Sequence, residues 1–237
     1  MIEKINLNNI LFLDIETVPE HQNYGILDAE TQYLWEHKTQ YQRKDEVSAE
    51  DFYERAGIWA EFGKIITISV GYFVNKGDIR NFRVTSFWGD EKKILNDFSN
   101  LLNTNFNGTQ HILCGHNAKE FDIPFIARRM IINGIALPNK LNLFGKKPWE
   151  VPHLDTLELW KFGDYKHFTS LKLLTKVLGI PSPKDDIDGS EVAHVFYVED
   201  NIDRIITYCE KDVIAVAQIF LRLRREDLLI DDEIIHV

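Results

Sequence analysis

Two carboxylates, Asp14 and Glu16, interrupt an apolar, β-rich run near the start of the chain. Side chains alternate faces along a strand, so these two point the same way while Leu13 and Ile15 point into a core. Like charges on one face repel each other, and a divalent cation relieves that repulsion, with hard oxygen ligands suited to Mg²⁺ or Mn²⁺. The alternative is a strand whose polar face only meets water, because a D-x-E pattern alone is a weak signal.

A second polar group, Asn117 to Asp122, follows the apolar run 111–116 at the entry to an expected helix. Asn117 can cap that helix, and a carboxylate at Asp122 interacts favourably with the helix dipole. Capping is therefore a complete structural alternative to a catalytic role. Phe121 belongs either to the core or to a surface on which a nucleotide base stacks.

The third group lies in the expected C-terminal helix, where Tyr208 and Asp212 are four residues apart and share a face. Their neighbours at helical spacing, Ile205, Ala215 and Val216, are apolar, which places Asp212 at or near the buried stripe. A carboxylate there needs a partner or a metal ion. A structural pair between the tyrosine hydroxyl and the aspartate is the alternative.

The elements that position these groups alternate between strand and helix patterns. Residues 64–73 and 79–88 have strand patterns, and the turn signal at 75–78 between them indicates a β-hairpin. Segments in which apolar residues recur every three or four positions are predicted to be helices. Short apolar or alternating segments are predicted to be strands or extended chain. The expected strands are 10–18, 64–73, 79–88, 111–116 and the extended 153–159, and the expected helices are 91–102, 119–134, 170–178, 190–197 and 203–224.

Taken together and in this order, the three motifs D-I-E-T, G-H-N-x-x-x-F-D and Y-x-x-x-D resemble the DEDD exonuclease superfamily. The tyrosine in the last motif is typical of the DEDDy branch, which includes the proofreading exonuclease domain of family B DNA polymerases. The resemblance spans roughly residues 10 to 220. It implies an α/β, ribonuclease H-like fold, in which a mixed five-stranded sheet with an antiparallel hairpin is flanked by helices.

The resemblance implies a 3′-5′ exonuclease that hydrolyses phosphodiester bonds at DNA 3′ ends by a two-metal-ion mechanism, in DNA repair or proofreading. Its substrate would be a single-stranded DNA 3′ end. Two Mg²⁺ or Mn²⁺ ions would be held by Asp14, Glu16, Asp122 and Asp212. Substrate contacts would come from Thr17, Asn117 and Phe121. Tyr208, whose hydroxyl has a reference pKa near ~10, would orient the attacking water rather than deprotonate it.

Two other functions compete with this one. Relatives with the same ligand set trim RNA, and no residue here can be assigned to sensing a 2′-hydroxyl. The other is a catalytically silent nucleic-acid-binding scaffold, which would have no need to retain four costly acids. Protein partners are not indicated by any motif.

Supporting residues are expected around the site. Asp155 and Asp188 are candidates to support the metal ligands without binding the metal themselves. For Asp188 the sequence Asp188-Gly189-Ser190 favours the alternative, a turn and helix cap. His116, His153 and His167 lack paired metal-ligand spacing, which favours structural roles.

Composition limits the function further. A net charge of −10 argues against a protein that coats nucleic acid non-specifically. Lysines nevertheless gather between residues 140 and 184, which permits a local phosphate-binding face, although ordinary solvated lysines are the alternative. They are Lys140, Lys146, Lys147, Lys161, Lys166, Lys172, Lys176 and Lys184.

Length and composition predict one domain, residues 1–237, with a helical insertion at 28–62. The two cysteines, Cys114 and Cys209, show no metal or disulfide spacing. No apolar stretch approaches the ~18 residues that a membrane span requires. We therefore expect a cytoplasmic protein that does not bind membranes.

Overall fold

Three long apolar runs form the centre of a mixed, six-stranded sheet in the order β5-β4-β1-β2-β3-β6. The computed structural model describes residues 2–43, 47–77, 79–164, 166, 168–181 and 187–237. β1 pairs antiparallel with β2 and parallel with β4, while β2 and β3 form the antiparallel hairpin. The strands are β1 Ile10–Pro19, β2 Gly63–Lys76, β3 Ile79–Trp88, β4 Ile112–Gly115, β5 Leu154–Asp155 and β6 Ile234–His236.

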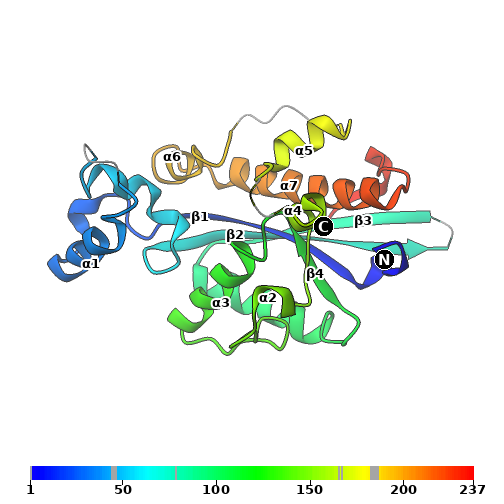
Figure 1. The fold of residues 1–237 in the computed structure, drawn as a ribbon, viewed down its shortest axis with the longest axis horizontal. Coiled ribbons are helices and arrows are strands. Elements are labelled where there is room, and N and C mark those ends of the chain that lie inside the picture. The colour runs from blue at the N-terminus through cyan, green and yellow to red at the C-terminus, as the bar shows by residue number, and fades with distance from the viewer. Residues whose placement is uncertain (1, 44–46, 78, 165, 167, 182–186) are drawn as a thin grey trace.

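Helices cover both faces of the sheet. Figure 1 shows α5, α6 and α7 on one side of the sheet and α2 and α3 on the other. The α-helices are α1 Ala29–Thr39, α2 Glu91–Thr104, α3 Asp122–Ile132, α4 Thr156–Lys161, α5 Leu171–Val177, α6 Val192–Tyr197 and α7 Ile202–Arg224. The 3₁₀ turns are η1 Ile2–Lys4, η2 Leu7–Asn9, η3 Tyr24–Ile26, η4 Asp51–Ile58, η5 Pro148–Glu150 and η6 Asp231–Glu233.

The alternation of β1 separates two cores. Leu13 and Ile15 belong to the core beneath α2 and α3, as the sequence predicts. The opposite row begins with Ile10 and Phe12, which pack in the core beneath α7. The Phe12 ring lies 5.9 Å from the Phe220 ring of α7 in an edge-on contact. The next positions of that row are Asp14 and Glu16, so the carboxylates replace apolar side chains on the face that α7 covers.

The 28–62 insertion lies at one end of the molecule, on the left in Figure 1, and contains α1 and η4. Its own apolar cluster surrounds Trp35, which is fully buried. The indole donates its N–H to the Ala49 carbonyl at 2.7 Å. A bond of 2.7 Å from the Thr17 hydroxyl to the Gly57 carbonyl ties the insertion to β1.

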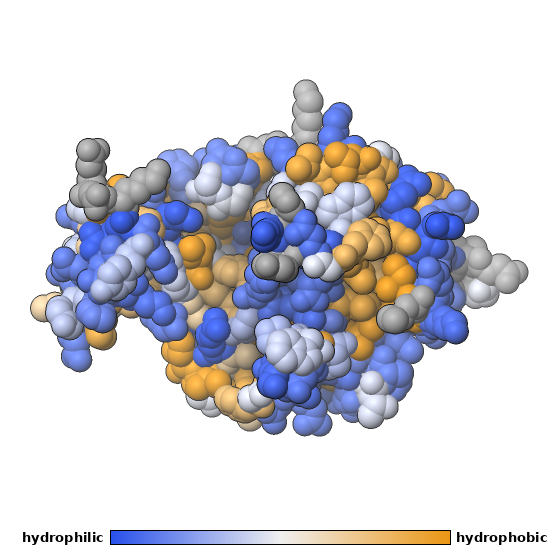
Figure 2. Space-filling model, viewed as in Figure 1, coloured by the Kyte–Doolittle hydropathy of each residue, from blue (hydrophilic) through white to orange (hydrophobic). Residues whose placement is uncertain are grey.

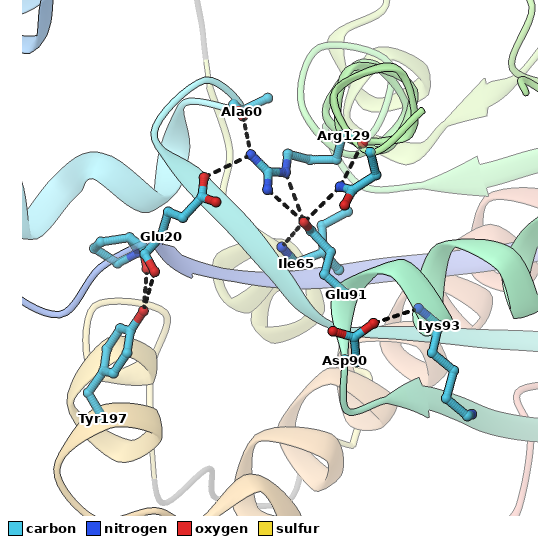
Figure 3. Close-up of polar contacts among 10 residues, drawn as sticks. Glu20, Ala60, Ile65, Asp90, Glu91, Lys93, Arg129 and Tyr197 are labelled. Carbon is cyan, nitrogen blue, oxygen red and sulfur yellow. Dashed lines mark hydrogen bonds and ion pairs between the residues drawn. The ribbon is translucent and has the colours of Figure 1, made fainter. Parts of the chain in front are cut away.

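Arg129, Glu91 and Glu20, together with Asn133, form a network that fixes the end of β1 to the helices α2 and α3 (Figure 3). We call it the Arg129 network. The Arg129 side chain is only 3% exposed, and its guanidinium binds both carboxylate oxygens of Glu91 at 2.8 and 2.6 Å. The same guanidinium donates to the Ala60 carbonyl and reaches Glu20 at 3.3 Å. Each of the three guanidinium nitrogens therefore donates to at least one acceptor.

The prediction of an extended segment at 153–159 is wrong for the residues after Asp155. β5 is only two residues long, and α4 begins directly after it. The Asp155 carboxylate accepts the backbone N–H groups of Leu157 and Glu158, which is an N-cap arrangement that starts a helix. A capping side chain thus overrides the strand-like alternation of the following residues.

Two other expectations need correction. Asn117 does not cap α3, because the helix begins only at Asp122 and its N-cap residue is Phe121. Asn117 instead adopts a left-handed conformation with φ of 62° and closes a turn. The sheet also has a sixth strand, β6, which pairs with β3 at the edge of the hairpin. No helix among the described residues is long and apolar enough to span a bilayer.

Candidate active site

Asp14 and Glu16 lie on β1 directly beneath α7. The backbone register with β2 shifts between Glu16 and Thr17, so a bulge follows the second carboxylate and bends the strand there. Asp14 is half-buried, and Glu16 is only 9% exposed. The strand thus presents both acids inside the molecule, next to each other on one face.

Asp122 joins these two from the first residue of α3. Its side chain is 3% exposed, and Oδ1 accepts the backbone N–H of Ile15 at 3.2 Å. Since Ile15 lies between Asp14 and Glu16, this bond places the third carboxylate next to the other two across 107 residues of sequence. The N-terminal end of a helix also favours a negative charge.

α7 brings the remaining residues from above the sheet. The buried stripe of this helix, which includes Ile205, Cys209 and Val213, faces β1, and Asp212 lies half-buried at its edge. The Cys209 thiol donates a hydrogen bond to Asp14 Oδ2 at 3.3 Å. The Tyr208 hydroxyl and Asp212 interact through a side-chain hydrogen bond. Three elements therefore converge on one carboxylate cluster: Asp14, Glu16, Asp122 and Asp212.

The electrostatics of the carboxylate cluster are unfavourable without a cation. Burial, then the charges of Asp122, Glu16 and Asp212, raise the pKa of Asp14 well above its usual range. Burial, then the charges of Asp212 and Asp122, raise the pKa of Glu16 well above its usual range. Burial raises the pKa of Asp122 to about 7, although its hydrogen bonds to backbone N–H groups oppose the shift. The cluster holds its charge at neutral pH only if a positive charge compensates it.

The donor set fits divalent metal ions. Ligand atoms of Asp14, Glu16 and Cys209 all lie within 4.8 Å of one another. Burial and the adjacent carboxylates raise the pKa of the Cys209 thiol, so it stays protonated and acts as a hydrogen-bond donor rather than as a ligand. Carboxylate oxygens remain as the ligands, which matches Mg²⁺ or Mn²⁺ better than a thiophilic metal.

Burial, then the negative charges of Asp212, Glu16 and Asp14, raise the pKa of Tyr208. Its hydroxyl therefore remains protonated throughout the neutral and moderately alkaline range. A protonated phenol half-buried beside the cluster can donate a hydrogen bond or orient a water molecule, but it cannot serve as a base.

Asp155 supports the loop that leads to Asp122. It is 2% exposed, and its carboxylate accepts the N–H groups of Asn117 and Lys119 at 2.9 and 3.0 Å. These bonds hold Asn117 in its left-handed conformation. They also bring a negative charge close enough to Asp122 to contribute to its raised pKa. The supporting position that the sequence suggests for Asp155 therefore agrees with its contacts.

The residues expected to contact substrate lie around the cluster in different settings. Thr17 follows the bulge and uses its hydroxyl to bind Gly57. Phe121 is half-buried, and its ring packs 5.4 Å from that of Phe125. The backbone of Asn117 is bound to Asp155. Their roles toward a substrate stay predictions.

Sequence reasoning missed the contact between Cys209 and Asp14. The signal was available in part, because Cys209 lies on the stripe that Ile205 and Val213 define at helical spacing. A residue on that stripe must face the sheet, and Asp14 points from the sheet toward the helix. Which strand residue it meets depends on how α7 is placed on the sheet, and the sequence does not specify this.

A cleft of about 1100 Å³ opens beside the cluster. Tyr208 and Asp212 line it from α7, and Ser170, Leu171 and Lys172 line it from the start of α5. Its volume slightly exceeds the range of about 300–1,000 Å³ that is typical of small-ligand sites.

Comparisons with known proteins agree with this geometry. Residues 58–233 match the family described as predicted 3′-5′ exonucleases related to the exonuclease domain of PolB, and this span includes Asp122, Tyr208 and Asp212. The fold is similar to that of a family B DNA polymerase from the hyperthermophilic archaeon Pyrobaculum calidifontis, with a TM-score of 0.54 and 13% sequence identity. That match covers 90% of this chain but only 24% of the polymerase chain. No curated protein matches.

Proposed function

The chain belongs to the family of predicted 3′-5′ exonucleases related to the exonuclease domain of PolB, and we propose that it removes nucleotides from DNA 3′ ends with two divalent ions. The observation that carries this proposal is the carboxylate cluster. Four acids from β1, α3 and α7 converge inside the molecule, and burial together with the charges of neighbouring carboxylates raises the pKa values of Asp14, Glu16 and Asp122. Such an arrangement is costly unless cations occupy it.

Each residue has a defined task in this proposal. Asp14, Glu16, Asp122 and Asp212 would hold Mg²⁺ or Mn²⁺. When bound, the ions would supply an activated water and neutralise charge on the phosphate. The Ile15 N–H fixes one oxygen of Asp122 and the Cys209 thiol fixes one oxygen of Asp14, so both carboxylates are oriented in advance. The protonated Tyr208 hydroxyl would orient the attacking water rather than accept its proton.

We further propose that residues 1–237 act as one exonuclease domain in which 28–62 is an insertion. The bond between Thr17 and Gly57 supports this, because the insertion is attached to the strand that carries the acids. A single-stranded DNA 3′ end is the proposed substrate, and repair or proofreading is the proposed context.

The experiment uses DNA and RNA strands of one sequence, each labelled at the 5′ end, with Mg²⁺, Mn²⁺ or EDTA. A ladder that shortens from the 3′ end, depends on the metal and disappears in Asp14→Ala supports the proposal. Faster cleavage of the RNA strand would replace the DNA assignment by RNA. Binding of both strands without cleavage of either would favour the silent scaffold instead.

A further inference from the structure

Two phenylalanines in the segment between α4 and α5 face solvent, which is unusual for residues that normally fill cores. Phe162 is 85% exposed and Phe168 is 67% exposed. Lysines are interleaved with them in the sequence, although the chain as a whole carries a net charge of −10. We call these residues the aromatic-lysine surface: Lys161, Phe162, Lys166, Phe168 and Lys172.

Two backbone features occur in the described part of this segment. Phe162 ends α4 in a left-handed conformation, with φ of 45° and ψ of 37°, which side chains of its size rarely adopt. Asp164 accepts the N–H of Lys166 at 3.0 Å in a local turn. The left-handed conformation of Phe162 terminates the helix, whereas its ring, which is largely exposed, buries little apolar surface there.

Both ends of the segment are fastened to the loop that leads to Asp122. The His116 ring contacts the Thr156 hydroxyl at 2.9 Å and the Thr169 carbonyl at 2.8 Å. Lys119 forms an ion pair of 2.7 Å with Glu158 of α4. Described residues on either side of the aromatic-lysine surface therefore contact the same loop that leads to the carboxylate cluster.

The surface is also continuous with the active-site cleft. Lys172 lines that cleft together with Tyr208 and Asp212. Figure 1 shows α4 and α5 on the same side of the sheet as α7. Beyond Lys172, the outer face of α5 exposes Leu173 and Val177, and Figure 2 shows apolar surface gathered there beside hydrophilic residues. A strand that leaves the cluster through the cleft meets alternating aromatic, apolar and cationic groups.

We propose that the aromatic-lysine surface binds the single-stranded nucleic acid that leads to the 3′-terminal nucleotide. This inference rests on the proposed function of the carboxylate cluster. Phe162 and Phe168 would stack against bases, which every base sequence allows, and the lysines would face phosphates. A single strand fits these groups better than an apolar protein segment does, because cations separate the rings and the surface continues into a site suited to phosphodiesters.

The first test measures binding of a fluorescein-labelled oligothymidylate of about 12 nucleotides by anisotropy, in EDTA so that no hydrolysis occurs. The Phe162→Ala/Phe168→Ala double variant is expected to bind on the order of tenfold more weakly or worse. Lys166→Ala/Lys172→Ala is expected to reduce the salt dependence, with the slope of log K against log salt less negative by about 1.4. The matched control is Tyr41→Ala, which removes an aromatic ring that is 92% exposed in the 28–62 insertion and should bind normally.

The second test uses a substrate too short to reach the surface, thymidine 5′-p-nitrophenyl phosphate. Its turnover should be unchanged in the double phenylalanine variant and lost in Asp122→Asn. Normal oligonucleotide binding by the double variant would overturn this inference while leaving the proposed function intact. A wild-type protein that neither binds nor cleaves nucleic acid would overturn both. Equal weakening by Tyr41→Ala would show a general surface effect and would also overturn the inference.

Discussion

The Arg129 network and the carboxylate cluster are two groups of buried charge with opposite balance. In the network, a guanidinium that is 3% exposed faces Glu91 at 2.6 Å and also reaches Glu20 and the Ala60 carbonyl. In the cluster, the strongest charge effects on Asp14 come from other carboxylates. The negative charges of the Arg129 network are therefore balanced by a cation of the chain itself, whereas those of the carboxylate cluster repel one another.

The difference separates what holds the fold from what performs the chemistry. A paired and fully hydrogen-bonded charge can remain in the interior, and the Arg129 network uses it to join the end of β1 to α2 and α3 (Figure 3). An unbalanced cluster lowers stability and persists only where its partner arrives from outside. The two groups should therefore respond in opposite ways to substitution.

The largest effect is expected on catalysis. Asp122→Asn and Asp212→Asn should each lower turnover by orders of magnitude, because each removes a charge that holds the ions while keeping the shape of the side chain. Cleavage rates under single-turnover conditions measure this loss. Asp97→Asn is the control, since Asp97 pairs with Lys93 on the surface of α2, away from the carboxylate cluster. Near-normal rates in both cluster variants would show that the cluster is not the catalytic centre.

The next largest effect is expected on stability. Arg129→Met should lower the free energy of unfolding by roughly 3–5 kcal/mol, because it leaves the Glu91 carboxylate, which is only 12% exposed, without its cation. Urea denaturation measures the change. Lys93→Met breaks an exposed ion pair and should cost less than about 1 kcal/mol. If the two variants were equally stable, the Arg129 network would not be the structural anchor described here.

A smaller effect links pH to stability. The folded pKa of Asp122 is about 7, above its ordinary value of 3.8, so the folded protein binds more protons than the unfolded chain between these values. Stability of the metal-free protein therefore falls as pH rises through this window. Thermal unfolding in EDTA should show a lower Tm at pH 8 than at pH 5.5, and Asp122→Asn should flatten that trend.

Metal binding should oppose the loss of stability that occurs as pH rises. Protons and cations compete for the same oxygens, so Mn²⁺ should raise Tm more at pH 8 than at pH 5.5. A shift in Tm that is independent of pH would place the metal elsewhere on the protein.

The smallest effect is expected at Tyr208. Tyr208→Phe removes one hydrogen bond and should lower turnover about tenfold, well short of the loss in Asp122→Asn. The alkaline side of the rate profile should not move, because the raised pKa keeps the Tyr208 hydroxyl protonated there. A shifted alkaline limb would mean that the hydroxyl itself titrates during turnover.

Local patterns were sufficient to predict most of the elements around the site. β1 alternates apolar and acidic residues, and α7 repeats apolar residues at helical spacing, so each element determines which way its own acids point. The sequence thereby predicted that Asp14 and Glu16 share a face, and the structure places both beneath α7.

Contacts between distant residues could not be predicted in the same way. β6 is three residues long, and its pairing with Phe82 to Val84 depends on where the chain returns after α7. The thiol of Cys209 meets Asp14 across 195 residues. Asn117 has the residue type of a helix cap, but its carbonyl accepts the N–H groups of Glu120 and Phe121 and so closes a turn. Its own backbone N–H donates to the distant Asp155 carboxylate.

The most direct test of the central claim is to locate bound manganese. A crystal of the protein grown with Mn²⁺ and a nucleoside monophosphate would give anomalous peaks at the metal positions. We expect two peaks bounded by Asp14, Glu16, Asp122 and Asp212, and none there in a crystal of Asp14→Ala. A crystal saturated with Mn²⁺ that shows no peak among these four carboxylates would contradict the claim that the cluster exists to hold cations.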